Sequence, residues 1–223
     1  MQPQPNRIRA YVWEFPVRFT HWINALAIVI FCITGFYIGH PFMRAISSEQ
    51  YIMGWMRFLH FTSAYVFLLS MIIRIYWMFA GNKYSSWRVF IPLTRRQWED
   101  MIGGLKFYLF MRKQPPYAAG HSAMASITYL FVFILFLFEI ASGFALYSQS
   151  HMKSAILTLL GGWMLGIMGV QTVRLLHHIV MWLLIVFTAI HVYIGWYLDI
   201  AEKNGVMGSI FGGFKFITGK EWE

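Results

Sequence analysis

The chain has 223 residues, of which 58% are hydrophobic, 19% aromatic and only 12% charged, and its formal net charge is +9. This composition is typical of an integral membrane protein. The single cysteine, Cys32, excludes an intrachain disulfide, a cysteine-based zinc site and an iron–sulfur cluster held by this chain alone. The basic residues lie between apolar stretches, which favours an orientation signal in a lipid bilayer over a nucleic-acid surface.

The first 17 residues are polar and basic, with no small-residue cleavage site after a short apolar core, so we expect no cleaved signal peptide. Four apolar stretches follow, each long enough to cross a bilayer: about 19–40, 53–80, 123–147 and 173–199. Backbone at membrane depth must satisfy its own hydrogen bonds, so each stretch is predicted to be a helix. The sequence therefore predicts a single all-α domain over 1–223, a bundle of four transmembrane helices.

Basic residues predict the orientation of these spans. Fourteen of the eighteen Lys and Arg residues fall on one side of a four-span chain. Because cytoplasmic loops carry the excess of Lys and Arg, both termini, the loop 81–122 and the tail 200–223 are predicted to be cytoplasmic. This topology predicts a bacterial cytoplasmic (inner) membrane protein. The middle loop contains RRQWEDMIGGLKFYLFMRK, whose aromatic and basic pattern favours a helix on the membrane surface. The Gly-rich tail is expected to be poorly ordered.

Histidines near the ends of the spans form pairs at matching depth. His21 begins the first span and His191 ends the fourth, both on the cytoplasmic side. His60 begins the second span and His177 begins the fourth, both on the opposite side. Histidine inside a membrane span is costly and usually functional, and imidazole is a common ligand of haem iron. The pairs His21/His191 and His60/His177 therefore predict two haem sites. The chain has no C-x-x-C-H motif, so the haem is predicted to be non-covalent haem b.

Three copies of R-x-x-H strengthen this prediction, each at the entrance to a span, with the arginines Arg18, Arg57 and Arg174. Positions three apart share a helix face, so each guanidinium lies one turn nearer the membrane surface than its histidine, at the level of the haem propionates. Arg74 lies at the depth of His191 and is a further propionate candidate. The alternative is that these arginines only anchor the helices at the interface.

The remaining candidates have simpler alternatives. His178 points about 100° away from His177 and is a fallback ligand. His121 opens the third span near the depth of His21 and His191, where it is a candidate for binding quinone or handling its protons. The alternative for His121 is a solvated loop histidine. Glu139 lies inside the third span and needs a partner or a proton, and a hydrogen bond to a neighbouring helix is favoured over proton conduction.

Four stretches resemble the cytochrome b subunits of membrane-bound nickel–iron hydrogenases: RFTHWINALAIVIFCITGFYIG, RFLHFTSAYVFLLSMIIRIYWMFAGNKYS, SGFALYS and LLHHIVMWLLIVFTAIHVY. The similarity runs through all four spans and is most specific in R-x-x-H-W followed by T-G and in R-I-Y-W-x-F-x-G-N-x-Y-S. The histidines that match the family's haem ligands are His21, His60, His177 and His191. The resemblance thus implies the same ligands as the comparison of depths.

The resemblance also implies a function. A periplasmic hydrogenase would deliver electrons from H₂ through the iron–sulfur small subunit to this chain, which would pass them to quinone. The hydrogen chemistry itself would belong to the large nickel–iron subunit, and no residue of this chain is predicted to be catalytic. One alternative is the same role for another periplasmic enzyme, such as formate dehydrogenase. A second alternative, from a different class, is a haem-free anchor or small transporter.

Overall fold

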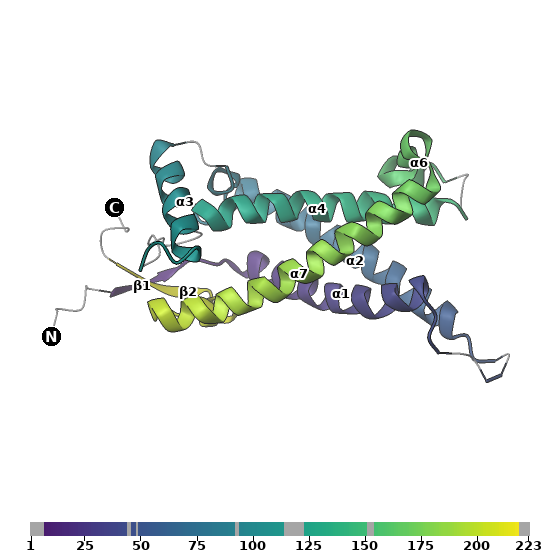
Figure 1. The fold of residues 1–223 in the computed structure, drawn as a ribbon, viewed down its shortest axis with the longest axis horizontal. Helices are drawn as coiled ribbons and strands as arrows, with labels where there is room; N and C mark the ends of the chain where they lie inside the picture. Colours follow the sequence, from purple (N-terminus) through teal and green to yellow (C-terminus); the bar gives the residue numbers. More distant parts are fainter. Residues whose placement is uncertain are drawn as a thin grey trace. The chain divides into compact units, whose positions relative to one another are not determined.

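The computed structural model describes residues 7–43, 46–47, 49–91, 94–113, 123–150 and 154–218. Figure 1 shows the elements along the chain. In chain order they are β1 (Arg7–Tyr11), α1 (Phe15–Gly39), α2 (Ile52–Ala80), the 3₁₀ turn η1 (Trp87–Val89), α3 (Arg95–Tyr108), α4 (Ala123–Ser148), α5 (Ala155–Leu157), the π-helical turn η2 (Thr158–Gly162), α6 (Trp163–Met168), α7 (Val170–Glu202), α8 (Val206–Gly212) and β2 (Phe214–Thr218).

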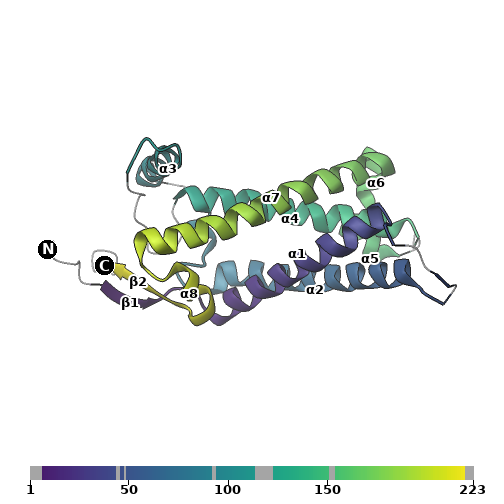
Figure 2. The same cartoon turned by 60° about the horizontal axis from the view of Figure 1, so that its bottom comes forward.

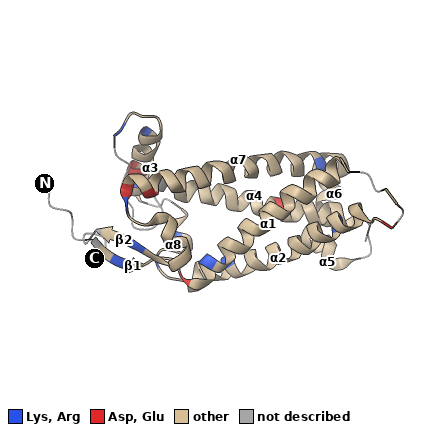
Figure 3. Cartoon of the chain, turned by 90° about the horizontal axis from the view of Figure 1, so that it is seen from below, with Lys and Arg blue, Asp and Glu red and all other residues tan. Residues whose placement is uncertain are grey.

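Within the described residues, four helices are long and apolar enough to cross a membrane: Phe15–Gly39, Ile52–Ala80, Met124–Ser148 and Val170–Glu202. These are the four predicted spans, extended by a few residues at some ends. Charged residues are sparse along them, as Figure 3 shows. Large apolar side chains such as Leu26, Leu69 and Trp182 are more than half exposed, which a helix tolerates when lipid covers that face. The predicted all-α membrane fold with four transmembrane helices is therefore confirmed.

The chain falls into two compact units, and each contains parts of the long helices. The first unit comprises the described residues within Met1–Arg18, Tyr76–Glu139 and His178–Glu223. The second unit comprises those within Phe19–Ile75 and Ile140–His177. That the whole chain is one domain remains a prediction.

In the first unit the two ends of the chain pair with each other. β1 and β2 form an antiparallel two-stranded sheet in which Ile8 lies opposite Ile217, and α8 leads into β2 (Figure 2). Ala10, Val12 and Ile217 are almost fully buried there, with Trp13 and Tyr84 packed against them. The tail up to residue 218 is therefore ordered, and the prediction of a poorly ordered tail is wrong for this part.

The glycines that made the tail look unstructured serve its turns. Gly205 and Gly213 flank α8 with φ angles of +76° and +85°, which L side chains rarely adopt. A Cβ at Gly213 would also lie 2.7 Å from the Trp13 carbonyl oxygen and would press on the Tyr11 ring. Its own carbonyl accepts hydrogen bonds from the backbone N–H groups of Val12 and Trp13. Glycine at this position thus allows the two ends of the chain to meet.

Glu14 joins the N-terminal segment to the end of α2 within the first unit. Its Oε2 atom accepts hydrogen bonds from the Trp77 indole at 2.8 Å, the Asn82 backbone N–H at 2.8 Å and the Ser85 hydroxyl at 3.3 Å. The Asn82 side chain donates to the Val12 carbonyl at 3.0 Å. We call Glu14, Trp77, Asn82 and Ser85 the Glu14 network. It gives the W-x-F-x-G-N-x-Y-S part of the second-span motif a structural role.

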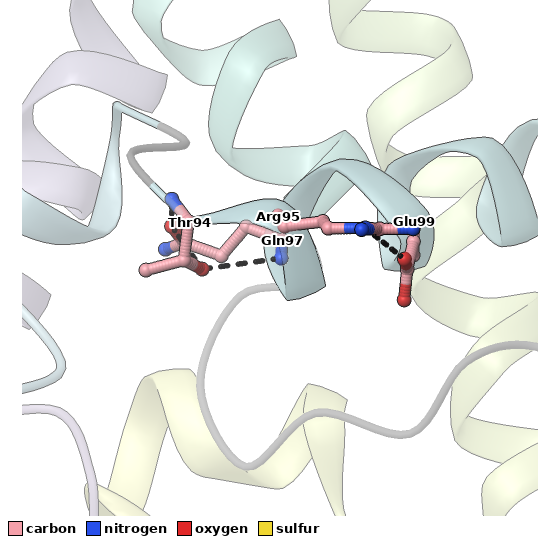
Figure 4. Close-up of polar contacts among 4 residues, drawn as sticks. All are labelled: Thr94, Arg95, Gln97 and Glu99. Carbon is pink, nitrogen blue, oxygen red and sulfur yellow. Dashed lines mark hydrogen bonds and ion pairs between the residues drawn. The ribbon is translucent and has the colours of Figure 1, made fainter.

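The helix predicted in the middle loop is present as α3. Thr94 and Gln97 form a capping box, in which the Thr94 hydroxyl accepts from the Gln97 N–H and the Gln97 side chain accepts from the Thr94 N–H (Figure 4). At the other end, Phe107 lies 6.2 Å from the Tyr197 ring of α7. Burial, together with the nearby Glu202 and Tyr197 side chains, raises the pKa of the Tyr108 phenol. The placement of α3 on a membrane surface remains a prediction.

The second unit contains a helical segment that the sequence analysis did not predict. α5, η2 and α6 cover 155–168, between the third and fourth spans. Gly161 in η2 packs directly on α4, where an added Cβ would overlap the Ala141 carbonyl oxygen and lie 2.8 Å from the Ala145 nitrogen. The aromatic pairs Phe61–Tyr147 and Tyr65–Phe144, with centroids 4.3 and 5.2 Å apart, join α2 to the same part of α4. This packing holds the residues around position 142 of α4 closely.

Candidate haem-ligand site

His60 is a half-buried residue near the start of α2, and it meets a hydroxyl of α1. The Thr34 Oγ1 atom lies 2.8 Å from His60 Nδ1 and 2.7 Å from the Ile30 carbonyl oxygen, one turn back on α1. Thr34 is buried, and the Phe31 ring packs edge-on against the imidazole at 5.1 Å. Two side chains of α1 thus contact the His60 ring, one through a hydroxyl and one through an aromatic ring.

His177 has a matching neighbour on α4. The Ser142 hydroxyl oxygen lies 2.8 Å from His177 Nδ1, and Ser142 is fully buried. Gly143 lies beside the same ring, since a Cβ there would be 3.5 Å from His177 Cε1. His177 is half-buried whereas His178 is exposed, which agrees with the 100° between adjacent helical positions. The packing therefore favours His177 over His178 as a ligand.

His60 and His177 lie in the same compact unit. A hydrogen bond from Nδ1 leaves the lone pair on Nε2, and a metal-binding histidine characteristically uses one nitrogen for the metal and the other for such a bond. Porphyrin supplies four ligands to its iron, so two axial histidines complete the coordination. The chemistry of the hydroxyl-bonded pair His60/His177 fits a haem, whose iron these two residues would hold.

Among the described residues, no group of three or more His, Cys, Asp or Glu side chains is placed to hold a metal ion. A haem differs from a bare ion in this respect, because it needs only its two axial positions filled by the protein.

His21 and His191 belong to different compact units, so their pairing remains a prediction. His191 in α7 has its own surroundings in the first unit. The Tyr129 hydroxyl of α4 lies 3.5 Å from His191 Nδ1, and the Phe187 ring stacks on the imidazole at 5.5 Å with an interplanar angle of 23°. His191 is half-buried among these aromatic side chains.

The candidate propionate partners differ in their contacts. Arg18 donates a hydrogen bond to the Phe211 carbonyl of α8, and Arg174 bonds Gln171 at 3.5 Å. Arg57 and Arg174 are exposed, and Arg74 is half-buried. Their contact with haem propionates remains a prediction. The quinone candidate His121 lies outside the described residues.

The sequence analysis missed Thr34, Ser142 and Tyr129. The first two share a signal, because each is a hydroxyl residue followed by glycine, in the pairs Thr34-Gly35 and Ser142-Gly143. Both pairs lie five or six residues before the end of their helix, on the odd-numbered spans. The first and third spans thus each carry a hydroxyl residue followed by glycine near the end of the helix. Tyr129 has no comparable signal among the many aromatic residues of the spans.

Four long apolar helices, two of which carry histidines within hydrogen-bond distance of hydroxyl groups, are typical of membrane cytochromes. A family model described as prokaryotic cytochrome b561 matches residues 12–213, nearly the whole chain. The chain belongs to this family.

Several curated proteins are similar to this chain over most of its length. A Cupriavidus necator protein named "Probable Ni/Fe-hydrogenase B-type cytochrome subunit" is 37% identical over 210 residues, which cover 92% of this chain and 86% of the relative. A Rhodobacter capsulatus protein of the same name is 32% identical over 216 residues, which cover 94% of this chain and 82% of that relative. The Escherichia coli K12 "Probable Ni/Fe-hydrogenase 1 B-type cytochrome subunit" is 31% identical, covering 96% and 94%.

These comparisons confirm two predictions: the family resemblance that was based on the four spans, and the class of cofactor. A cytochrome of b type holds haem b, so the predicted kind of cofactor is confirmed, while the count of two haems remains a prediction.

Proposed function

We propose that this chain is a dihaem b-type cytochrome that anchors a periplasmic nickel–iron hydrogenase and transfers its electrons to membrane quinone. Electrons from H₂ would arrive through the iron–sulfur clusters of the hydrogenase small subunit. The names of the relatives support the partner, and the family supports the haem. The observation that carries the proposal is the pair His60/His177, with a buried hydroxyl on the Nδ1 atom of each ring.

The residues of this chain bind and orient the cofactors. His60 and His177 hold one haem and His21 and His191 a second, with Arg18, Arg57, Arg74 and Arg174 as propionate partners. When bound, haem supplies the one-electron chemistry that links the two-electron oxidation of H₂ to quinone. His121 is the quinone candidate, and the hydrogen chemistry stays with the large nickel–iron subunit.

The same proposal includes the orientation in the bacterial inner membrane. Both termini, α3 and the β1–β2 sheet face the cytoplasm, because basic residues are concentrated there. The His60/His177 haem then lies toward the periplasm, where electrons from the hydrogenase enter. The His21/His191 haem lies toward the cytoplasmic side, where electrons leave for quinone.

Histidine replacement tests the proposal in the purified complex. His60→Ala and His191→Ala should each lower the haem content in a pyridine haemochrome assay and abolish H₂-dependent quinone reduction. Dye-linked H₂ oxidation by the partner should persist, because that reaction does not need this chain. His178→Ala, an exposed neighbour of His177, is the matched control and should keep both haem and quinone reduction.

Two results would contradict the proposal. Full quinone reduction in either His60→Ala or His191→Ala would rule out the assigned ligand pairs. A purified wild-type complex without nickel would point to another periplasmic dehydrogenase as the partner.

A further inference from the structure

We propose that Thr34 and Ser142 are positioning residues, whose hydroxyl oxygens accept hydrogen bonds from the Nδ1–H groups of His60 and His177 and so hold both rings in the tautomer that presents Nε2 to haem iron. The inference rests on the proposed function in assigning His60 and His177 to one haem. All four residues lie within the second compact unit. They come from four different helices, α1, α2, α4 and α7.

The contacts of Thr34 determine the direction of its hydrogen bond to His60. A hydroxyl carries one proton, and Thr34 Oγ1 lies 2.7 Å from the Ile30 carbonyl oxygen, which can only accept. The Thr34 hydroxyl therefore donates its proton in a hydrogen bond to the Ile30 carbonyl oxygen. The remaining contact, 2.8 Å to His60 Nδ1, must then be donated by the imidazole. A neutral imidazole that donates from Nδ1 has its lone pair on Nε2, which is the atom a metal requires.

Ser142 stands in the same relation to His177 on the other pair of helices. Its hydroxyl oxygen is 2.8 Å from Nδ1, equal to the Thr34–His60 distance, and its side chain is fully buried. Gly161 packs against the neighbouring Ala141 carbonyl and holds this part of α4 in place. A buried hydroxyl at hydrogen-bond distance, in a closely packed part of α4, limits rotation of the His177 ring.

The acceptors also set the electronic character of the ligands. A hydroxyl oxygen is a weaker acceptor than a carboxylate, so the Nδ1–H bond increases the basicity of Nε2 only moderately. Removing the acceptor should decrease electron donation to the iron. The ferric state is then less stabilised, and the midpoint potential of that haem rises.

Variants that remove each hydroxyl test this inference in the whole complex. Thr34→Val and Ser142→Ala should each raise the midpoint potential of one haem and shift the low-spin ferric EPR signal of that haem alone. Loss of such a hydrogen bond typically weakens metal binding about 10- to 100-fold, so haem transfer to excess apomyoglobin should also be faster. Thr34→Ser retains the hydroxyl and should behave as wild type.

Matched controls separate the hydrogen bond from general packing. Thr188 also donates to the carbonyl four residues back, Leu184, at 2.8 Å, and Ser148 is a buried serine of α4 that donates to the Ala145 carbonyl. Neither contact involves a histidine. Thr188→Val and Ser148→Ala should leave potential, EPR signal and haem retention unchanged.

The outcomes distinguish failure of the positioning role of Thr34 and Ser142 from failure of the proposed function. Wild-type potential and EPR signals in both Thr34→Val and Ser142→Ala overturn the positioning role and leave the proposed function intact, as do equal shifts in the control variants. If Thr34→Val does not accumulate, Thr34→Ser and Ser142→Ala carry the test. Haem loss in Thr34→Ser would overturn the role of the hydroxyl. A wild-type complex that contains no haem would overturn the proposed function itself.

Discussion

The two compact units use buried polar groups in different ways. In the first unit the Glu14 carboxylate accepts three hydrogen bonds, two from side chains and one from a backbone N–H, all of them from the end of α2 and the turn that follows. In the second unit the hydroxyls of Thr34 and Ser142 each meet one nitrogen of an imidazole ring. In the proposed tautomer, the other ring nitrogen has a lone pair for haem iron. The first arrangement joins two segments of the chain, and the second is proposed to position haem ligands.

The largest expected effect comes from replacing a histidine of the second unit. His177→Ala should remove the haem proposed to bind at His60, because one proposed ligand and the Ser142 hydrogen bond are lost together. His178→Ala should keep that haem. The pyridine haemochrome assay on purified complex measures the difference. Equal haem content in the two variants would show that the second unit is not organised around His177.

Gly161 offers the next largest effect. Gly161→Ala places a methyl group on the Ala141 carbonyl oxygen, and overpacking against backbone costs about 1–3 kcal/mol or more. The displaced α4 backbone carries Ser142, so haem retention should fall together with thermal stability in detergent. Gly166→Ala is the control, because a Cβ there meets nothing within 4 Å and alanine favours a helix by about 0.5–1 kcal/mol. A Gly161→Ala variant as stable as Gly166→Ala would contradict this packing.

The Glu14 network should affect stability without affecting the haem of the second unit. Glu14→Ala leaves the Trp77 indole and the Asn82 backbone N–H without this acceptor, which costs about 1–3 kcal/mol. Thermal melts should show the loss of stability, while the His60/His177 haem keeps its midpoint potential. A shift of that potential in Glu14→Ala would remove the distinction between the two units.

The smallest expected effects lie at the start of α3. Thr94→Ala removes the helix cap and should cost about 1 kcal/mol. Arg95→Ala breaks the Arg95–Glu99 ion pair of 3.0 Å, whose side chains are 93% and 64% exposed, and should cost no more than about 0.5 kcal/mol. Limited proteolysis of the middle loop should therefore be faster in Thr94→Ala than in Arg95→Ala. The reverse order would mean that the ion pair, rather than the cap, holds α3.

The sequence by itself determined the four spans, because about 20 consecutive apolar residues have no other stable place than a bilayer, and membrane-depth backbone must be helical. It also identified His60 and His177 as candidate ligands, since burying histidine in an apolar span is energetically unfavourable and usually indicates a function. Helical periodicity favoured His177 over His178 but left His178 as a fallback ligand.

Only the tertiary structure decided which side chains support those histidines and which part of the tail is ordered. Thr34 and Ser142 are ordinary residues of an apolar helix until two helices bring them within 2.8 Å of an imidazole nitrogen. Gly213 looks like a flexible residue until β2 pairs with β1, about 200 residues away in the chain, and leaves no room for a Cβ. Both depend on contacts between distant segments, which local patterns of hydrophobicity and charge do not encode.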